Sequence, residues 1–468
     1  MDRRHFLMGS AAALSAAQSV FGSANETVRV AVIGVGGHGK TLGGRGKNHI
    51  EGYPKVPNVE IVAVCDVDET HLNYGAGLVE KLQGKKPQTY VDIRKLLENK
   101  EIDAISIATP NHWHTLMTIW ACQAGKDVYV EKPCSHNLFE AKQIVAAARK
   151  YNRMVQQGSQ IRSSVAVQDA VQKMRDGFLG DIYLGRGLCY KWRDTIGRAP
   201  VQPVPAGVDY NLWTGPAPMH QFTMNRFHYN WHWFWDTGNG DLGNQGIHQV
   251  DVARWGLGVK FPVKATAIGG HFMFDDDQET PNTLNCAFEF NESGKRKMME
   301  FEVRHWISNH ESTIGVPRQR TVTAMAEGGE GRPQGAEGGR GMGMQRRGQP
   351  DTIGDIFYGS KGYLVVDSYS SYKTFMGRDQ EPGPAANEGG DHFANFIDAV
   401  RSRNRESLHA EIEEGAASTV LVHLANISYR VGRTINFDPA TMTITGDAEA
   451  SKLATRVYRK PFVVPEKV

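Results

Sequence analysis

Residues 27–41 read TVRVAVIGVGGHGKT, an apolar run rich in β-branched residues that ends in several glycines. The run predicts a buried strand, and the glycines predict a turn from that strand into a helix. In the pattern Gly34-x-Gly36-x-x-Gly39, the first glycine permits the tight turn, the second lets a pyrophosphate approach the backbone, and the third packs the helix on the strand. The pyrophosphate would meet the amides at the start of that helix. The stretch therefore predicts a dinucleotide-binding fold.

A carboxylate follows the next apolar run, residues 59–64, where a strand tip is expected. This residue, Asp66, would accept a hydrogen bond from the 2′-hydroxyl of an adenine ribose and repel a 2′-phosphate, which favours NAD over NADP. It follows Gly34 by 32 positions, and an insertion at residues 41–58 explains the excess over the usual spacing of about 20. The alternative is that Asp66 only closes the strand in an Asx turn.

Strand and helix signals then alternate, which indicates an α/β fold with a doubly wound parallel sheet. The expected strands are residues 104–108 and 128–130, and the expected helices are residues 91–99, 114–124 and 137–151. Two polar clusters directly follow these strands, TPNHWH at 109–114 and EKP at 131–133. Because ligands of such sheets lie beyond the carboxyl ends of the strands, both clusters are expected at the cofactor.

The composition narrows the class of protein. A chain of 468 residues is longer than one usual domain, and 40% hydrophobic with 22% charged residues is typical of a globular protein. Lys+Arg 53 balance Asp+Glu 51, so the charge gives no reason to expect a nucleic acid partner. No apolar run reaches the roughly 18 residues that span a bilayer. We therefore expect no membrane insertion and a small-molecule partner.

The first 26 residues are expected to be an export signal. Arg3 and Arg4 precede a mildly apolar, Ala-rich stretch, and the paired arginines resemble a twin-arginine signal, whose transporter moves folded proteins. The predicted location is periplasmic or secreted, and the alternative is a first helix of the domain. The five cysteines are widely spaced and odd in number, which predicts buried thiols rather than a disulfide framework.

Four motifs, taken in order, resemble the Gfo/Idh/MocA oxidoreductases, the group of glucose–fructose oxidoreductase and inositol dehydrogenase. They are GVGGHG at 34–39, TPNHWH at 109–114, EKP at 131–133 and GNGDLGNQGIHQVDVARWGLG at 238–258. Two further stretches, NLWTGPAP at 211–218 and FHYNWHWFWD at 227–236, resemble a secreted bacterial branch of that family.

The resemblance implies an NAD-binding Rossmann domain at 27–157 and a C-terminal α/β domain at 158–468. The second domain would carry an open, mostly antiparallel sheet that often serves in oligomerisation, so a homo-oligomer is expected. Its expected strands are residues 182–192, 263–274, 283–290, 297–305, 353–358 and 363–366, and its expected helices are 246–257, 393–402 and 412–431. Residues 327–350 contain nine glycines and are expected to form a flexible loop, with substrate access as a candidate role.

The resemblance also implies the catalytic groups. Lys132 of the EKP motif would sit beside the nicotinamide, where desolvation lowers a lysine pKa. His248 matches the family's catalytic histidine and is the stronger proton-transfer candidate, because imidazole titrates near neutral pH unaided. Many members carry Asp four residues before this histidine, but this chain has Asn244, which cannot accept a proton. Either His248 acts without a carboxylate, or Asp241 or Asp236 substitutes.

The motifs together give the expected cofactor contacts, with NAD as the cofactor. These contacts are Gly34, Gly36, Gly37, His38, Gly39, Asp66, Thr109, Asn111, His114, Glu131 and Lys132.

Aromatic residues at every second position of residues 227–235 would give an extended strand one aromatic and one mainly polar face. Such a strand suits a sugar, with core packing as the alternative for most of the rings. The expected substrate contacts are Arg162, Arg193, Trp231, His232 and Asp236, where the two arginines come from the resemblance and can equally be structural. A zinc site from His228, His232 and His248 lacks supporting cysteine or carboxylate spacing, so no metal is expected.

The expected function is hydride transfer between tightly held NAD(H) and a hydroxyl-bearing carbon of a pyranose or glycoside. One alternative is a redox-neutral glycosidase that oxidises the sugar transiently, eliminates the aglycone and reduces the sugar again. A second alternative is a non-catalytic protein that binds sugar and NAD. The presence of both Lys132 and His248 argues against the second alternative, and the loss of the family Asp argues mildly for it.

Overall fold

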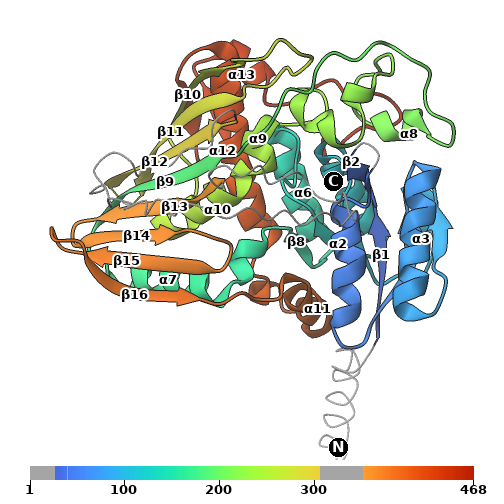
Figure 1. Ribbon diagram of the computed structural model, residues 1–468, viewed down its shortest axis with the longest axis horizontal. Helices are drawn as coiled ribbons and strands as arrows, with labels where there is room; N and C mark the ends of the chain where they lie inside the picture. Colours follow the sequence, from blue (N-terminus) through green and yellow to red (C-terminus); the bar gives the residue numbers. More distant parts are fainter. Residues whose placement is uncertain (1–26, 39–40, 293, 306–350) are drawn as a thin grey trace, which may run out of the picture.

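The computed structural model describes residues 27–38, 41–292, 294–305 and 351–468. Figure 1 shows two sheets side by side, with the N-terminal parallel sheet at the right and a larger sheet at the left. The expected export signal, Gly39, the side chain of His38 and the Gly-rich stretch 327–350 lie outside the described residues.

The first sheet has six parallel strands, which confirms the predicted doubly wound fold. The strands lie in the order β5 (Gln88–Tyr90), β4 (Val59–Cys65), β1 (Val28–Ile33), β6 (Ala104–Ile107), β7 (Asp127–Val130) and β8 (Val155–Gln157). The chain runs outward from β1 in both directions, so a crevice opens beyond the carboxyl ends of β1 and β6. Strand β1 is buried along nearly its whole length, as its apolar run predicts.

One helix follows each of the strands β4, β5, β6 and β7. These helices are α3 (Glu69–Gln83), α4 (Ile93–Leu97), α5 (His114–Gln123) and α6 (Leu138–Lys150). Three begin at capping residues, because the side chains of Asp68, Asp92 and Asn137 accept backbone amides in the first turns of α3, α4 and α6. These caps fix where each connection leaves the strand edge that faces the crevice.

The glycine turn does not lead directly into a helix, and this prediction is wrong. The chain first forms a hairpin of β2 (Gly37–His38) and β3 (Thr41–Leu42), and only then enters α2 (Arg45–Gly52) and the short turn η1 (Tyr53–Lys55). The close-packing role predicted for Gly39 falls to Gly46, where a Cβ would lie 2.0 Å from the carbonyl oxygen of Gly34. Because of the insertion, the glycine that packs the helix closely on the strand is Gly46 rather than Gly39.

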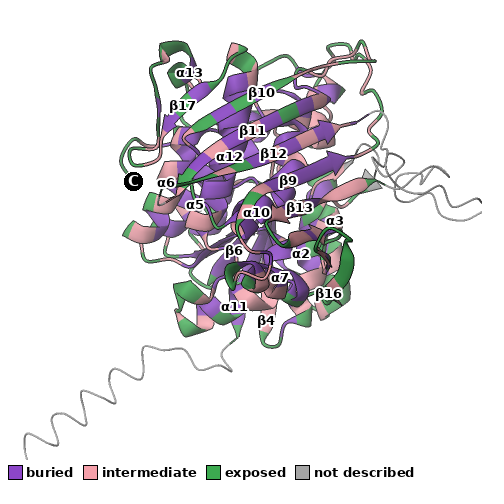
Figure 2. Cartoon of the chain, turned by 90° about the vertical axis from the view of Figure 1, so that its left-hand side faces the viewer, coloured by how far each residue is buried: buried purple, intermediate pink, exposed green. Residues whose placement is uncertain are grey.

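The second sheet is open and mostly antiparallel, as expected. Among the described residues its order is β16 (Glu381–Asn387), β15 (Ser371–Met376), β14 (Gly362–Val366), β13 (Thr352–Gly359), β9 (Ile182–Tyr190), β12 (Lys295–Arg304), β11 (Thr283–Glu292), β10 (Lys264–Gly270), β17 (Ile435–Asp438) and β18 (Thr443–Thr445). Strands β9 and β12 pair in parallel. Helices α7 (Val165–Arg175), α10 (Gly246–Leu257) and α12 (Ile412–Val431) pack on one face, and Figure 2 shows the opposite face.

One hydrophobic core spans both sheets. Helix α11 (His392–Ser402) packs under the parallel sheet, where the rings of Phe396 and Tyr129 lie 5.9 Å apart. The chain beyond α13 (Ala448–Lys452) returns to the first domain and places Phe462 5.3 Å from the ring of Trp113. Late segments of the chain therefore complete the packing of the dinucleotide-binding domain.

The aromatic segment at residues 227–235 is not an extended strand, and this prediction is wrong. His228 has φ +50°, which breaks an extended run, and the chain forms the 3₁₀ turns η4 (Met224–Arg226) and η5 (His228–Trp233). Side chains three residues apart eclipse in such a turn, so the rings of Tyr229 and His232 lie 4.8 Å apart. Trp233 and Phe234 are buried away from the cavity that His228, Tyr229, Trp231 and His232 line, and Phe227 is buried but borders the same cavity.

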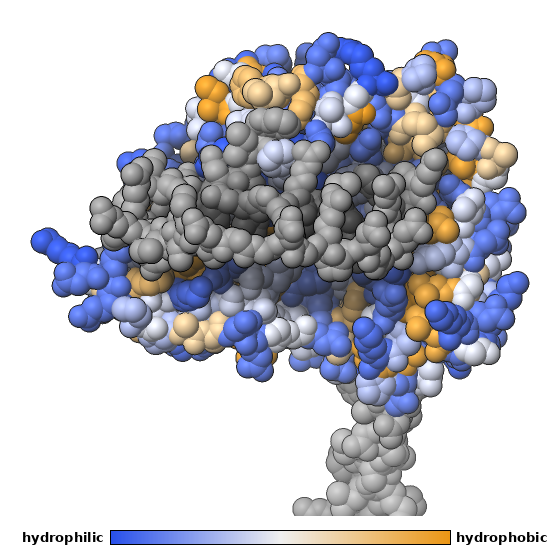
Figure 3. Space-filling view, viewed as in Figure 1, coloured by the Kyte–Doolittle hydropathy of each residue, from blue (hydrophilic) through white to orange (hydrophobic). Residues whose placement is uncertain are grey.

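The surface carries mainly hydrophilic residues in the view of Figure 3, with apolar residues in small groups. Among the described residues, no helix is long and apolar enough to cross a membrane. All five cysteines are buried free thiols, which confirms that prediction.

Gly46 offers a test of the displaced glycine. A methyl group at Gly46 would push α2 away from the Gly34 turn, so Gly46→Ala should lower the free energy of unfolding by about 1 to 3 kcal/mol. Gly77→Ala is the matched control, because Gly77 lies within α3 and a Cβ there meets nothing within 4 Å. That change should raise stability by up to ~1 kcal/mol. Urea denaturation of both variants measures the difference, and equal stabilities would contradict the packing role.

Candidate active site

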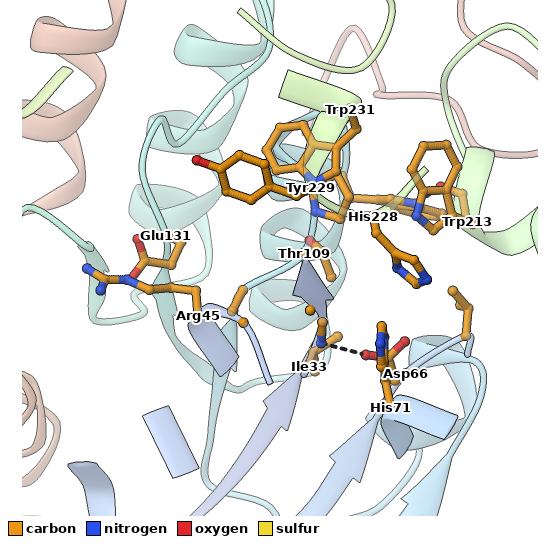
Figure 4. Close-up of a pocket in the computed structure, with 18 of the residues that line it drawn as sticks. Ile33, Arg45, Asp66, His71, Thr109, Glu131, Trp213, His228, Tyr229 and Trp231 are labelled. Atoms are coloured by element: carbon orange, nitrogen blue, oxygen red, sulfur yellow. Dashed lines mark hydrogen bonds and ion pairs between the residues drawn. The ribbon is translucent and has the colours of Figure 1, made fainter. Parts of the chain in front are cut away.

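A cavity of about 450 Å³ lies beyond the carboxyl ends of β1, β4 and β6. In Figure 4, Asp66 and His71 lie on the side of the parallel sheet, Trp213, His228, Tyr229 and Trp231 lie opposite them, and Arg45 and Glu131 lie at one end. The predicted residues that line the cavity are Gly34, Gly36, Gly37, Asp66, Thr109, His114, Glu131, Lys132, Trp231, His232, Asn244 and His248.

Four predicted contacts lie outside this cavity, and one of them, Arg193, pairs with Asp241. Asn111 is buried and donates its amide to Asn239 Oδ1 at 2.5 Å. Arg162 is buried in a two-pronged ion pair with Asp251, at 2.7 and 2.8 Å. Asp236 lines a second cavity. The structure thus corrects the contacts predicted for these residues, because distant parts of the chain already engage Asn111 and Arg162 and the fold turns Asp236 elsewhere.

The turn after β1 has the shape that a dinucleotide backbone needs. Gly34 and Gly36 have φ of +81° and +59°, left-handed conformations that favour glycine. A Cβ on Gly34 would lie 2.9 Å from the backbone of Ala108 and Thr109, so the neighbouring strand leaves no room for a side chain. A Cβ on Gly36 would meet nothing within 4 Å. The backbone at Gly36 therefore borders open space, as the predicted approach of a pyrophosphate requires.

Asp66 has the position expected of a ribose acceptor and also forms the Asx turn that was the alternative. It lines the cavity at the tip of β4, and its Oδ2 accepts the amides of Val35 and Gly36 at 2.7 and 3.2 Å. Its Oδ1 accepts the amide of Asp68 at 3.0 Å, which is the Asx turn. The carboxylate therefore fixes the glycine turn and keeps a negative charge at the cavity wall.

The aromatic segment touches the first domain beside Asp66. His228 Nε2 lies 3.3 Å from Asp68 Oδ2, and the His228 ring lies 4.5 Å from that of His71. We call Asp68, His71 and His228 the clasp. Burial alone would raise the pKa of Asp68, but the contact with His228 holds it below its usual value. The left-handed backbone of His228 is unfavourable for a non-glycine residue, and such strain concentrates at functional sites.

The clasp also brings together three groups that can ligate a metal, with their ligand atoms within 4.8 Å of one another. Of the zinc candidates considered from the sequence, His228 belongs to this group, whereas His232 and His248 do not. The contact between His228 and Asp68 accounts for the closeness of these atoms without an ion.

Glu131 of the EKP motif anchors the opposite end of the cavity. Its Oε1 accepts Arg45 Nε at 3.1 Å and Gln160 Nε2 at 3.0 Å, and it contacts His49 Nε2 at 3.1 Å. Burial by itself would raise the pKa of Glu131, but Arg45, His49 and the neighbouring Lys132 hold it well below its usual range. Glu131 is therefore a permanent anion that fixes Arg45 at the cavity.

Lys132 is a partly buried amine of lowered pKa. Desolvation lowers its pKa to about 8, although the charges of Glu131 and Asp241 oppose the shift. Its Nζ donates to the backbone oxygen of Asn244 at 2.7 Å and approaches Asn244 Oδ1 at 3.4 Å. Asn244 ends the short helix α9 (Gly240–Asn244). The residue that replaces the family Asp therefore holds the lysine.

Asp241 does not stand in as a proton acceptor. Arg193 donates to both of its oxygens at 2.7 Å, and His305 Nε2 lies 2.9 Å from Oδ2. Asn244 Nδ2 donates to Oδ1 at 3.1 Å. Burial would raise the pKa of Asp241, but Arg193 and His305 hold it well below its usual range. Asp241 and Arg193 lie behind the cavity wall and position Asn244, and through Asn244 they position Lys132.

Two of the histidines that line the cavity, His248 and His232, are neutral. Burial, reinforced by Lys132, holds the pKa of His248 well below its usual range, and burial lowers that of His232 to about 3. His232 Nδ1 lies 2.5 Å from the carbonyl oxygen of Tyr229, which can only accept, so Nδ1 carries the proton and Nε2 is an acceptor. This reverses the expected ranking, because the pKa of Lys132 lies nearer to neutrality than that of His248.

Sequence reasoning missed several lining residues. Tyr369 lies between β14 and β15, 5.2 Å from the ring of His248, and its hydroxyl accepts from Gln245 at 3.0 Å. No motif surrounds Tyr369, so the sequence carried no signal for it. Arg45 was discoverable in principle, since a basic residue among the glycines of the inserted segment suits a pyrophosphate.

These observations fit a bound NAD and define the class as a two-domain, NAD-binding oxidoreductase, because the glycine turn, the acidic strand tip and a partly buried lysine share one cavity. The chain belongs to the Gfo/Idh/MocA oxidoreductase family. Residues 28–159 match its NAD-binding Rossmann fold, and residues 166–268 and 366–464 match its C-terminal alpha/beta domain.

Curated relatives include enzymes that act on glycosides. A glycosyl hydrolase family 109 protein of Saccharopolyspora erythraea is 33% identical over 168 residues, which is 35% of either chain. An alpha-N-acetylgalactosaminidase of Shewanella oneidensis is 28% identical over 164 residues, 34% of either chain. The match spans about a third of the length of these relatives.

Solved structures share the fold along most of the chain. An aldose-aldose oxidoreductase from Caulobacter crescentus, complexed with glycerol, has a TM-score of 0.60 at 17% identity and covers 88% of this chain and 100% of its own. A levoglucosan dehydrogenase complexed with NADH and levoglucosan has a TM-score of 0.60 at 16% identity, with 88% and 99% covered. At these identities the likeness establishes the fold.

The position of Asp66 gives a prediction about cofactor choice. We expect the protein to bind NAD more tightly than NADP, because the carboxylates of Asp66 and Asp68 repel a 2′-phosphate. Asp66→Ala should weaken NAD binding by about tenfold or more, since it removes a charged acceptor and frees the glycine turn. Calorimetric titration of cofactor-free protein measures both affinities. Equal or tighter binding of NADP by the unmodified protein would show that Asp66 has another role.

Proposed function

We propose that this protein moves a hydride between tightly held NAD(H) and a hydroxyl-bearing carbon of a pyranose or glycoside. The observation that carries the proposal is Lys132, a partly buried amine that lines the cavity of the glycine turn, lies 2.7 Å from the Asn244 backbone oxygen and has a lowered pKa. Bound NAD supplies the hydride acceptor. The residues of this chain hold the sugar and handle its hydroxyl proton.

Oxidation of a carbinol removes a hydride from carbon and a proton from oxygen, and it leaves a carbonyl. The neutral form of Lys132 can take this proton at Nζ, and with a pKa of about 8 it is partly neutral near neutral pH. A base is most effective when its pKa lies near the working pH. The Asn244 backbone oxygen, 2.7 Å from Nζ, holds the amine before and after it takes the proton.

The cavity histidines supply hydrogen bonds rather than charge. Neutral His248 lines the cavity, and its buried Nδ1 has no hydrogen-bond partner among the described residues. The free Nε2 of His232 is an acceptor for a sugar hydroxyl. We assign the main proton transfer to Lys132 and the orientation of the reacting hydroxyl to His248 and His232.

Ring faces at the cavity support a sugar as substrate. Trp231 and His232 stack with centroids 3.6 Å apart, and Trp213 and Tyr229 line the same cavity. Flat rings pack against the C–H faces of a pyranose, and the polar groups beside them bind its hydroxyls. The sugar and sugar-like ligands named for the solved structures agree with this substrate class.

A redox-neutral glycosidase is the second candidate. The curated relatives named as glycosyl hydrolase family 109 proteins and as an alpha-N-acetylgalactosaminidase favour it. In this reaction the sugar is oxidised, the aglycone is eliminated, water adds to the resulting unsaturated sugar, and the carbonyl is reduced again. The same lysine would take the hydroxyl proton in the first step and return it in the last.

Export and assembly belong to the same proposal. The first 26 residues support delivery to the periplasm or beyond, and the open face of the second sheet offers a surface for a homo-oligomer. Outside the cytoplasm a freely exchanging NAD would be lost, so the cofactor must stay bound. The clasp joins the aromatic segment to the first domain at the acidic end of the cavity and supports this retention.

Lys132 gives a test of the proton chemistry. Lys132→Met should leave NAD bound and slow turnover by about 10² to 10⁴. In the unmodified enzyme the base must be unprotonated, so kcat/KM for sugar oxidation should rise with pH below about 8 and level off above it. Steady-state rates from pH 6 to 10 measure the profile. A flat profile in this range would exclude Lys132 as the base.

Two neighbours distinguish positioning from proton transfer. Asn244→Ala should lower turnover and shift the apparent pKa, because the amide that approaches Nζ is lost. Asp241→Asn should act in the same direction through Asn244. Full activity of Asn244→Ala combined with complete loss in Asp241→Asn would instead place the proton on Asp241.

The proposed function is tested by mass spectrometry of sugars incubated with purified protein and no added nucleotide. We expect NAD(H) to remain with the protein through desalting, and turnover to proceed when donor and acceptor sugars are both present. A mass loss of two hydrogens identifies the oxidoreductase, and cleavage of a glycoside identifies the second candidate. No product from any sugar, or release of NADH to solution, would overturn the closed cycle. His228→Ala should speed dissociation of the cofactor but leave the apparent pKa of Lys132 in the pH profile unchanged.

A further inference from the structure

A second cavity of about 180 Å³ lies apart from the NAD site. Its walls come from the C-terminal end of α12, residues 235–239 and residues 453–456, together with His136 ahead of α6. Among the described residues, the two cavities share no lining residue. The proposed chemistry uses none of the groups that line this second cavity.

Arg456 reaches this cavity with unused donors. Its Nη1 donates to the carbonyl oxygen of Asp236 at 2.6 Å and to His136 Nδ1 at 3.3 Å. Its Nε and Nη2 are buried and have no hydrogen-bond partner among the described residues. Buried donors without partners destabilise a fold, and those of a charged group do so most.

His136 adds a third donor. A guanidinium can only donate, so His136 Nδ1 is the acceptor of its contact with Arg456 and the ring proton is on Nε2. Burial and the charge of Arg456 hold the pKa of His136 well below its usual range, which keeps the ring neutral in this tautomer. His136 is only 8% exposed, and Nε2 has no partner in hydrogen-bonding geometry. The buried groups left unpaired here are therefore all donors.

Arg430 contributes a second positive charge. It lies at the end of α12 and makes no hydrogen bond or ion pair with any described residue, and its guanidinium lies 5.1 Å from the ring of Trp235. One carboxylate, that of Asp236, also lines the cavity, and His220 Nε2 contacts it at 2.7 Å. Two arginines and one carboxylate line the cavity, and the carboxyl groups of Glu140 and Glu279, which do not line it, lie near enough to interact with Arg456 and Arg430 respectively.

We propose that this second cavity binds a small oxyanion, a phosphate or carboxylate group, between Arg430, Arg456 and His136. An oxyanion supplies acceptors to the unpaired donors of Arg456 and His136 and pairs with the guanidinium of Arg430. The cavity has room for a phosphate or a short carboxylate but not for a dinucleotide, given its volume of about 180 Å³. The inference is independent of the proposed reaction.

Isothermal calorimetry on the full chain tests the proposal. Sodium phosphate and sodium acetate are titrated separately in Tris chloride buffer at constant ionic strength. We expect saturable binding of at least one of the two anions. The anion that binds more tightly shows whether the cavity prefers a phosphate or a carboxylate group. Arg430→Gln should weaken this binding by about tenfold or more, because it removes a charge-assisted contact.

Two further variants control for charge and folding. Arg378→Gln removes the same charge from an exposed turn outside the cavity and should bind like the unmodified protein. Arg456→Gln should also weaken binding, but it loses the contact with Asp236, so its thermal unfolding is measured alongside. Arg430 makes no hydrogen bond to the described residues, so Arg430→Gln still tests the proposal if Arg456→Gln fails to fold. Absence of saturable binding of both anions, or equal binding by Arg430→Gln, would overturn the proposal.

Discussion

The buried carboxylate of Asp241 is the constraint around which the reactive end of the cavity is built. A desolvated carboxylate is tolerated only where it is paired with a charge and hydrogen-bonded. Arg193 supplies the charge, and His305 and Asn244 supply further contacts from separate parts of the chain. Because these partners fix the orientation of the Asn244 amide, its oxygen can face the amine of Lys132. The ion pair of Arg193 and Asp241, which does not line the cavity, thus helps to fix the position of Lys132 Nζ.

The same logic explains why asparagine is tolerated where many relatives carry aspartate. A second carboxylate beside Asp241 would place two like charges in one buried site, and one of them would have to stay protonated. Asparagine instead presents a donor to Asp241 and an acceptor to Lys132. The cost is a proton acceptor, and this is the role that we propose for Lys132, whose pKa is lowered.

Local patterns in the sequence predicted the central strands of both sheets and helices α5, α6, α10, α11 and α12, but not α3, α7 or the edge strands β16 and β18. Helices α10 and α12 begin and end at the predicted residues, since each carries an apolar pattern that ends at a glycine in the left-handed conformation. The pattern failed where one residue overrides it, as at His228, whose positive φ turns an alternating aromatic run into a 3₁₀ turn. The partners of Arg162 and Asn111 lie 89 and 128 positions away, and no local signal reports such pairings. The position of Tyr369 at the first cavity and the walls of the second cavity likewise bring together residues that lie far apart in the sequence.

Asn239 shows how the two cavities are connected. Its Oδ1 accepts from Asn111, within the loop that lines the NAD site, and its Nδ2 donates to the carbonyl oxygen of His136, beside the second cavity. Residues 228–232 carry rings to the first cavity, and residues 235–239 form a wall of the second. Suppose that an anion in the second cavity stabilises residues 235–239 in this position. It would then also stabilise the contact between His228 and Asp68. Binding free energies are reciprocal, so a held cofactor would in turn strengthen the binding of the anion.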